Sequence, residues 1–188
     1  MSKTMNLQTW DLEKIRREIN NEYSNGKNNH VYTDASYQVQ NNSLGIGVHI
    51  KDKEGNRFSY YSGKISEYYN DFERFYYEDI ALWLGLKLCL ANNIFKPIVY
   101  IDSQDVYKRY VRIIKIPKNE RVSHKVINSN MLNIHVDDIE KIWNEIRELY
   151  YQLRIVRLNL INSHVGIFGN EEADKMATKG RTLTEKLL

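Results

Sequence analysis

The sequence has little of what defines several classes of protein. Its 188 residues include only two prolines, nine glycines and one cysteine, Cys89. A lone cysteine excludes an intramolecular disulfide framework and a cysteine-based zinc finger. With 42% hydrophobic residues, the scarcity of proline and glycine also excludes collagen-like, linker-like and wholly disordered chains.

Long apolar runs are absent as well. No stretch approaches the roughly 20 apolar residues of a membrane-spanning helix, and the N-terminal MSKTMNLQTW has no apolar core typical of a secretory signal. We therefore expect a cytoplasmic protein with no membrane partner. At about 150 residues per domain, the length favours one mixed α/β domain with a short appendage.

The appendage is predicted at residues 1–28, and the main domain at 29–188. Thr9 or Asp11 is a candidate N-cap for a helix in the appendage. That helix is expected to dock on its own domain through a narrow apolar stripe, although a partner such as a replication protein could bind it instead. The stripe consists of residues at helical spacing: Leu12, Ile15, Ile19 and Tyr23.

The predicted strands and helices of the main domain follow the order of a mixed α/β sheet. Three short strands with tight connections come first and form an antiparallel meander, at 30–33, 45–50 and 57–61. The elements that follow are a largely buried helix at 80–90, a strand at 97–101, helices at 103–112 and 137–151, a strand at 154–160 and a helix at 170–179. Because helices separate the later strands, these should run parallel, which gives a five-stranded mixed sheet flanked by helices.

Four carboxylates lie at the ends of these predicted elements. Asp34 ends the first strand, Asp102 follows the strand at 97–101, Glu78 begins the apolar helix and Asp174 lies on the last helix. Clustered carboxylates raise each other's pKa unless divalent cations hold them, and oxygen-rich sites of this kind suit Mg²⁺ or Mn²⁺. Glu78 shares its helix face with apolar or small residues: Ala81, Leu82, Gly85 and Cys89.

Four short motifs surround these carboxylates. They are Tyr32-Thr33-Asp34-Ala35-Ser36, Glu78-x-x-Ala81, Ile101-Asp102-Ser103-Gln104 and the run from Ser163 to Ala177. Together they resemble ribonuclease H of the type 1 branch, in order over about residues 29–180. The last run is the most specific, because it is similar to the His-x-Gly-Ile-x-Gly-Asn-Glu-x-x-Asp-x-x-Ala signature of retroelement ribonuclease H domains.

The resemblance implies a ribonuclease H-like fold and a metal-dependent endoribonuclease. The substrate would be the RNA strand of an RNA–DNA hybrid, cut to leave 3′-hydroxyl and 5′-phosphate ends. The resemblance also implies that Asp34, Glu78, Asp102 and Asp174 hold two magnesium ions (Mg²⁺), with Mn²⁺ as an alternative. Two cations at such a site activate water and stabilise the leaving 3′ oxygen. His164 would assist proton transfer or product departure.

The sequence departs from the family pattern near three of these residues, Glu78, His164 and Asp102. Phe75 stands where the family often has an asparagine that helps to read the RNA strand, and Ser163 replaces the glycine that commonly precedes the histidine. Asp79 stands where an apolar residue is usual; it lies about 100° around the helix from Glu78 and is predicted to face the exterior. Asp105 adds a second carboxylate near Asp102.

Basic residues are concentrated between Tyr107 and Lys125. This segment carries seven basic residues and one acid, a net charge of +6, while the whole chain carries +3. Its position is similar to that of the basic protrusion of cellular ribonucleases H, which implies salt-sensitive binding of DNA-strand phosphates. The basic residues are Lys108, Arg109, Arg112, Lys115, Lys118, Arg121 and Lys125. Candidates for contacts to RNA 2′-hydroxyls are Ser36, Ser103 and Asn170.

Two other functions remain compatible with this pattern. One is a weakly active or inactive module that binds hybrids on the same fold, and the presence of all four carboxylates and His164 argues against it. The other is a DNA-directed nuclease or integrase, which the run Gly169-Asn170-Glu171-Glu172-Ala173-Asp174 disfavours.

Overall fold

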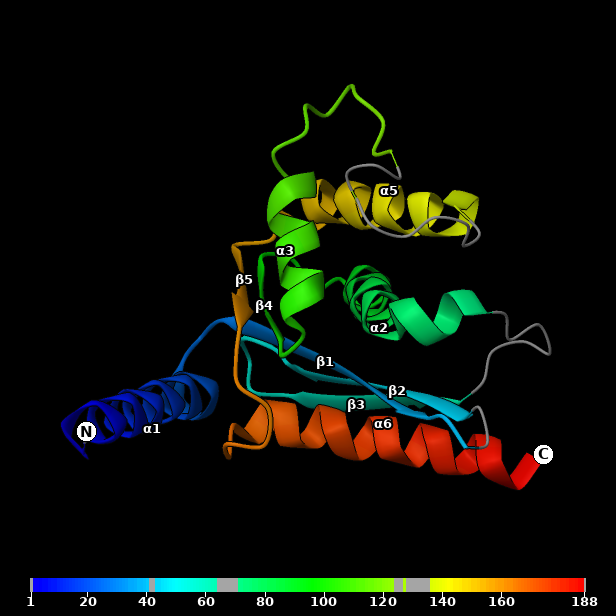
Figure 1. Cartoon of the computed structure of the whole chain (residues 1–188). Coiled ribbons are helices and arrows are strands. Elements are labelled where there is room, and N and C mark those ends of the chain that lie inside the picture. Colours follow the sequence, from blue (N-terminus) through cyan, green and yellow to red (C-terminus); the bar gives the residue numbers. More distant parts are fainter. Residues whose placement is uncertain (1, 41–42, 64–70, 124–126, 128–135, 188) are drawn as a thin grey trace.

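The chain folds around one five-stranded sheet with the strand order β3-β2-β1-β4-β5 (Figure 1). The computed structural model describes residues 2–40, 43–63, 71–123, 127 and 136–187. β1 pairs antiparallel with β2, and β2 with β3, whereas β1, β4 and β5 run parallel. This confirms the predicted mixed sheet. The strands are β1 Asn29–Gln38, β2 Ser43–Lys51, β3 Arg57–Ser62, β4 Pro97–Ile101 and β5 Arg157–Leu160.

Helices cover both faces of the sheet. α2, α3 and α5 lie on one face and α6 lies on the other, while α1 extends to one side (Figure 1). No helix among the described residues is both long and apolar enough to cross a membrane. The helices are α1 Ser2–Asn25, α2 Asp71–Ala91, α3 Gln104–Ile113, α5 Val136–Leu153 and α6 Phe168–Leu187.

The predicted apolar face of α2 is the face that packs against the sheet. Ala81, Leu82 and Cys89 are wholly buried, and Gly85 is buried between them. A Cβ at Gly85 would collide with the methyl group of Thr33 on β1, so the glycine lets α2 approach the strand closely. Because Glu78 belongs to this face, the packing of α2 directs it toward the end of the sheet.

On the opposite face, α6 packs against the backbone of β2. A Cβ at Gly45 would collide with the backbone of Ala177, and one at Gly47 with the carbonyl of Ala173. Two strand glycines therefore let a helix lie directly on the sheet. This contact fixes α6 relative to β1, the neighbour of β2.

Several element boundaries differ from the prediction, and three of these differences have a direct physical reason. α1 begins at Ser2 rather than after Thr9 or Asp11, because no proline or glycine interrupts the first 25 residues. β1 continues past Asp34 to Gln38, since it stays paired with β2 over that length. β5 begins at Arg157 rather than at 154, because Arg154 has a left-handed backbone with φ of 54° that ends α5.

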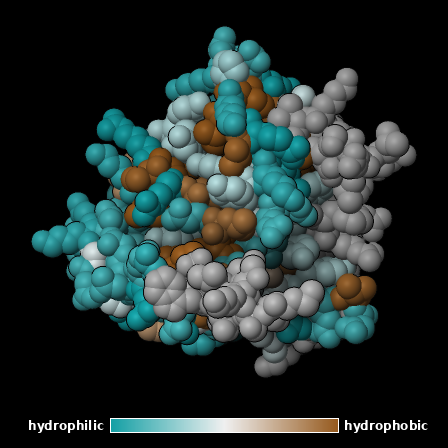
Figure 2. Space-filling model, turned by 60° about the vertical axis from the view of Figure 1, so that its left-hand side comes forward, coloured by the Kyte–Doolittle hydropathy of each residue, from teal (hydrophilic) through white to brown (hydrophobic). Residues whose placement is uncertain are grey.

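The surface around α1 and β5 mixes hydrophilic and hydrophobic residues. Figure 2 shows this side of the molecule, where hydrophobic residues lie in separate patches within a mostly hydrophilic surface. Several of the largest aromatic side chains lie in the interior instead. Trp143, Tyr32 and Tyr100 are almost wholly buried and lie on the two faces of the sheet, Trp143 in one core cluster and the two tyrosines in the other.

Candidate functional site

Two aspartates meet where the parallel strands β1 and β4 stop pairing. Tyr32 of β1 is paired with Tyr100 of β4 at the end of their ladder. Asp34 and Asp102 each follow two residues later, so the register places them side by side. A carboxyl end of neighbouring parallel strands is a common place for a binding site in open α/β sheets.

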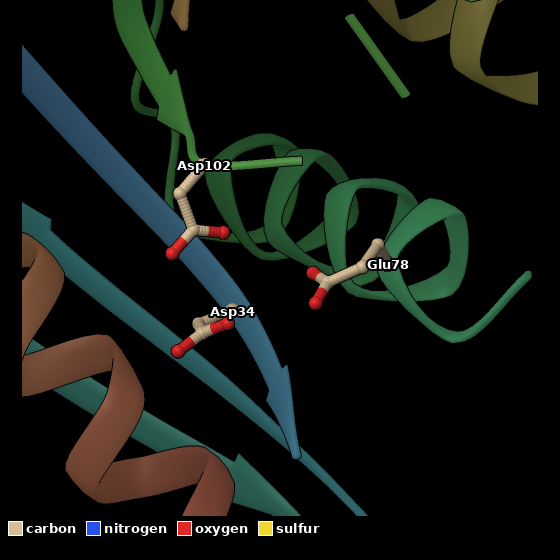
Figure 3. A group of neighbouring side chains, drawn as sticks. All are labelled: Asp34, Glu78 and Asp102. Carbon is tan, nitrogen blue, oxygen red and sulfur yellow. The ribbon is translucent and has the colours of Figure 1, made fainter. Parts of the chain in front are cut away.

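Glu78 completes a group of three carboxylates. The helical conformation of α2 is interrupted at Tyr76, with φ of −125° and ψ of 20°, and Glu78 lies just after this kink. Figure 3 shows the carboxylates of Asp34, Glu78 and Asp102 directed toward one another from β1, α2 and the end of β4. One oxygen from each lies within 4.8 Å of the others. The structure therefore brings together three of the four predicted metal ligands.

The three carboxylates make each other harder to ionise. Burial, followed by the negative charge of Asp102, raises the pKa of Asp34 from 3.8 to about 7, although the Ala35 N–H donated to Asp34 acts in the opposite direction. Burial and the charges of Asp34 and Asp102 also raise the pKa of Glu78 well above its ordinary value. A divalent cation would remove this repulsion, and an all-oxygen donor set is what Mg²⁺ and Mn²⁺ take. The residues present thus fit a metal centre.

Asp174 and His164 lie at the edge of this cluster. Asp174 is not one of the three grouped carboxylates, but its charge and hydrogen bonding contribute to the raised pKa of Asp34. His164 Nδ1 lies 3.9 Å from Asp174 Oδ2, and their side chains are 73% and 36% exposed. The histidine is therefore open to solvent, while the aspartate connects it to the carboxylate cluster.

The three residues predicted to contact RNA 2′-hydroxyls have different surroundings. Asn170 is buried; its Nδ2 donates to Asp102 at 3.4 Å, and its Oδ1 has no hydrogen-bond partner among the described residues. Ser103 is the N-cap of α3, where its Oγ accepts the Val106 N–H. Ser36 Oγ accepts a hydrogen bond from Arg181 at 2.8 Å. Asn170 thus offers a free acceptor beside the carboxylates.

Asp79 does not face the exterior, as the sequence predicted. It is wholly buried and accepts two hydrogen bonds from Arg109, at 2.9 and 3.0 Å, and one from Trp143 Nε1 at 2.8 Å. The error came from judging Asp79 by its rotation from Glu78 alone. Leu82 and Leu86, three and seven positions later, lie on the same helix face as Asp79 and are fully buried.

Arg109 is likewise not part of an exposed phosphate-binding surface. Its guanidinium is held by Asp79 and lies 5.3 Å from the ring centre of Tyr76. Val106, Tyr110 and Ile113 share its face of α3, and this apolar spacing was the signal that could have identified Arg109 as buried.

The other predicted basic residues remain accessible, apart from Lys125, which lies outside the described residues. Lys118 contacts the ring of Tyr151 on α5, with its Nζ 5.2 Å from the ring centre. The exposed basic residues on α3 and the segment that follows it are Lys108, Arg112, Lys115, Lys118 and Arg121.

The sequence did not single out an aromatic pair beside the carboxylates. The rings of Tyr37 and Tyr77 are stacked, with centres 5.9 Å apart and an angle of 18° between their planes. Burial and then the charges of Glu78, Asp34 and Asp102 raise the pKa of Tyr77. The only local signal was the position of Tyr77 directly before Glu78, and fourteen tyrosines in the chain gave it little weight.

Comparisons with solved structures agree with this fold. RNase H1 from Halobacterium salinarum has 16% sequence identity and a TM-score of 0.53, over 81% of this chain and 96% of that one. RNase H1 isolated from compost has 18% identity and a TM-score of 0.52, over 86% and 99%. A foamy viral protease–reverse transcriptase solved with double-stranded DNA has 20% identity and a TM-score of 0.53, over 82% and 93%.

These likenesses at low identity establish the fold. Among the curated proteins, none is significantly similar in sequence. The family model described as RNase H matches residues 26–182, which is most of the chain. The chain therefore belongs to the RNase H family of ribonucleases.

Proposed function

We propose that this ribonuclease cuts the RNA strand of RNA–DNA hybrids at a centre of two divalent cations, leaving 3′-hydroxyl and 5′-phosphate ends. The observation that carries the proposal is the group of Asp34, Glu78 and Asp102, whose oxygens converge within 4.8 Å inside an RNase H fold. Three buried or half-buried acids without their own cation are costly to ionise, so their convergence favours a site for external cations.

The residues around the cluster have distinct roles in this proposal. Asp34, Glu78 and Asp102 would hold Mg²⁺ or Mn²⁺, with Asp174 at the edge. The cations would supply an activated water and stabilise charge on the leaving 3′ oxygen. Because His164 is solvent-exposed and its Nδ1 lies 3.9 Å from Asp174 Oδ2, it would move a proton or help the product to leave.

The hybrid would extend from the carboxylates along α3. Ser103, the N-cap of α3, directly follows Asp102, so the helix leads away from the cluster toward the exposed basic residues. Lys108 and Arg112 are four positions apart and share one face of α3. These two side chains, together with the exposed Lys115, Lys118 and Arg121, would bind phosphates of the DNA strand. Asn170 Oδ1 and Ser36 would contact the RNA strand.

A cytoplasmic location is part of the proposal. The single cysteine, Cys89, cannot form an intramolecular disulfide, and burial raises the pKa of its thiol to about 12. Such a chain is suited to a reducing compartment.

The experiment that tests the function is a substrate panel. Labelled RNA–DNA hybrid, double-stranded RNA, double-stranded DNA and both single strands are incubated with the protein and Mg²⁺, then with Mn²⁺. The proposal predicts cleavage of the RNA strand of the hybrid and none without a divalent cation. Preferential cleavage of duplex DNA would instead support a DNA-directed nuclease, and tight hybrid binding without cleavage would support a binding module.

A further inference from the structure

The last turns of α1 are joined to the domain next to the His164 loop, residues 162–167. Tyr23 is buried and its hydroxyl is hydrogen-bonded to Nε2 of His49 at 2.8 Å. The ring of Tyr23 also lies edge-on to that of Phe168, the first residue of α6, with centres 6.4 Å apart. Earlier on the same stripe, Leu12 and Ile15 are 40% and 48% exposed. Only the C-terminal half of the stripe is therefore used for packing.

Asn20 joins α1 to the His164 loop through both halves of its carboxamide. Its Nδ2 donates to the carbonyl of Gly166 at 2.8 Å, and its Oδ1 accepts the N–H of Phe168 at 2.9 Å. These partners are 146 and 148 residues away in the chain. Because donor and acceptor are both engaged, the amide fixes the loop in position as well as in orientation.

The His164 loop has a backbone that needs such support. His164 and Gly166 both lie in the left-handed region, with φ of 53° and 79°. A non-glycine residue in this region persists where surrounding contacts hold it. Glu171 supplies a third contact by accepting the N–H of Gly166 at 3.2 Å. The loop is thus held from α6 on one side and from α1 on the other.

We propose that α1 is a positioning element for the reaction, in which Asn20 holds the His164 loop so that the imidazole stays beside Asp174. This inference rests on the proposed role of His164. The side chain of His164 is 73% exposed and its contact with Asp174 is long, at 3.9 Å, so the place of the ring depends on the backbone that carries it. Releasing the Asn20 contacts widens the range of positions of the ring and lowers the fraction of productive complexes.

The test compares two asparagines of the same helix. Asn20→Ala removes both contacts to the loop, whereas Asn21→Ala changes an exposed neighbour that accepts a hydrogen bond from Asn25 within the helix. Asn20→Ala is expected to lower kcat on the hybrid about tenfold with KM unchanged, a scale that fits the loss of two ordinary hydrogen bonds. Asn21→Ala is expected to leave both constants unchanged. Equal kcat values for the two variants would overturn the proposal.

A double-mutant cycle separates this inference from the function on which it rests. In a His164→Ala background, Asn20→Ala should change kcat less than about twofold, because the group that it positions is gone. If Asn20→Ala lowers kcat equally in both backgrounds, the positioning role is wrong and the role of His164 stands. If His164→Ala itself leaves kcat unchanged, the role of His164 is wrong and the positioning role with it.

Hydrogen exchange gives a readout that does not depend on activity. In the metal-free protein, amides in the peptide spanning residues 162–169 should exchange faster in Asn20→Ala than in Asn21→Ala, with the rest of the domain unchanged. Asn20→Asp, which keeps the acceptor for Phe168 and loses the donor to Gly166, should give an intermediate rate; it serves as the main variant if Asn20→Ala folds poorly. Unchanged exchange in this peptide would contradict the proposal.

Discussion

Glu78 and Asp79 are neighbours on α2, but they belong to two regions with opposite electrostatics. Asp79 is wholly buried and is neutralised within the protein by Arg109, with a further hydrogen bond from Trp143. Burial raises the pKa of both acids, but Arg109 and the Trp143 hydrogen bond act against that rise at Asp79, whereas the charges of Asp34 and Asp102 add to it at Glu78. Asp79 is thus paired with a basic side chain of the protein, whereas the adjacent Glu78 is grouped only with other acids.

The difference separates a structural acid from a functional one. A buried ion pair that the chain completes by itself holds elements together, here α2, α3 and α5. Carboxylates that repel one another in a fixed geometry lower stability unless a ligand cation joins them. We therefore expect the Asp79 network to control folding and the Asp34, Glu78 and Asp102 cluster to control cleavage.

The largest expected effect is on catalysis. Asp102→Asn should lower the rate of hybrid cleavage at least about 10⁴-fold, equal to about 5.5 kcal/mol of transition-state stabilisation, because a central carboxylate is lost from the cluster. The matched control is Asp105→Asn, an exposed carboxylate on the first turn of α3, which should change the rate less than about twofold. Single-turnover cleavage and hybrid binding are measured together. Surviving cleavage with Asp102→Asn would show that the centre lies elsewhere.

The next largest effect is on stability. Asp79→Ala leaves Arg109 buried without its partner and should lower the free energy of unfolding by about 3–5 kcal/mol. Urea unfolding measures this loss. The double variant Asp79→Ala with Arg109→Met should recover part of it, because the unpaired charge is removed. A loss below about 1 kcal/mol for Asp79→Ala would mean that the network is not a structural one.

In the cluster of Asp34, Glu78 and Asp102, removing a carboxylate should raise the stability of the metal-free protein rather than lower it. The folded protein keeps a proton on Asp34 up to about pH 7, whereas the unfolded chain loses it near 3.8, so stability without metal falls as pH rises between these values. Asp34→Asn should therefore raise the free energy of unfolding at pH 8 by about 1–3 kcal/mol. Urea unfolding with and without Mg²⁺ checks this, and Mg²⁺ should narrow the gap. A less stable Asp34→Asn in metal-free buffer would refute mutual repulsion.

The smallest expected effect concerns the exposed basic residues. Lys115→Ala should weaken hybrid binding about threefold and reduce the slope of log K against log salt by about 0.9, since one phosphate contact is lost. Lys53→Ala, an exposed lysine in the turn between β2 and β3, is the control and should change neither quantity. Fluorescence anisotropy at several salt concentrations measures both. An unchanged slope for Lys115→Ala would remove this lysine from the phosphate-binding surface.

Local patterns in the sequence were sufficient to predict elements whose burial follows the spacing of their apolar residues. The strand at 97–101 and the buried face of α2 were predicted correctly, because continuous apolar runs and 3.6-residue spacing report burial directly. The convergence of Asp34, Glu78 and Asp102 was predicted from element ends and motifs, and the parallel pairing of β1 with β4 accounts for it.

Other features depend on contacts between distant segments. Asp79 and Arg109 find each other across 30 residues, and charge alone suggested that both were exposed. The bonds from Asn20 to the His164 loop span 146 and 148 residues, so neither local propensity nor a motif could reveal them. Tertiary packing decided these positions, and the local signs of it were the apolar residues that share a helix face with Asp79 and with Arg109.

The most direct test of the difference between the two regions is a calorimetric titration with Mn²⁺. Wild-type protein and Asp105→Asn should bind Mn²⁺ alike, whereas Asp102→Asn should bind at least about tenfold more weakly, because it removes one carboxylate from the three that converge within 4.8 Å. Equal Mn²⁺ affinity for wild-type protein and Asp102→Asn would contradict the assignment of this cluster as the metal centre.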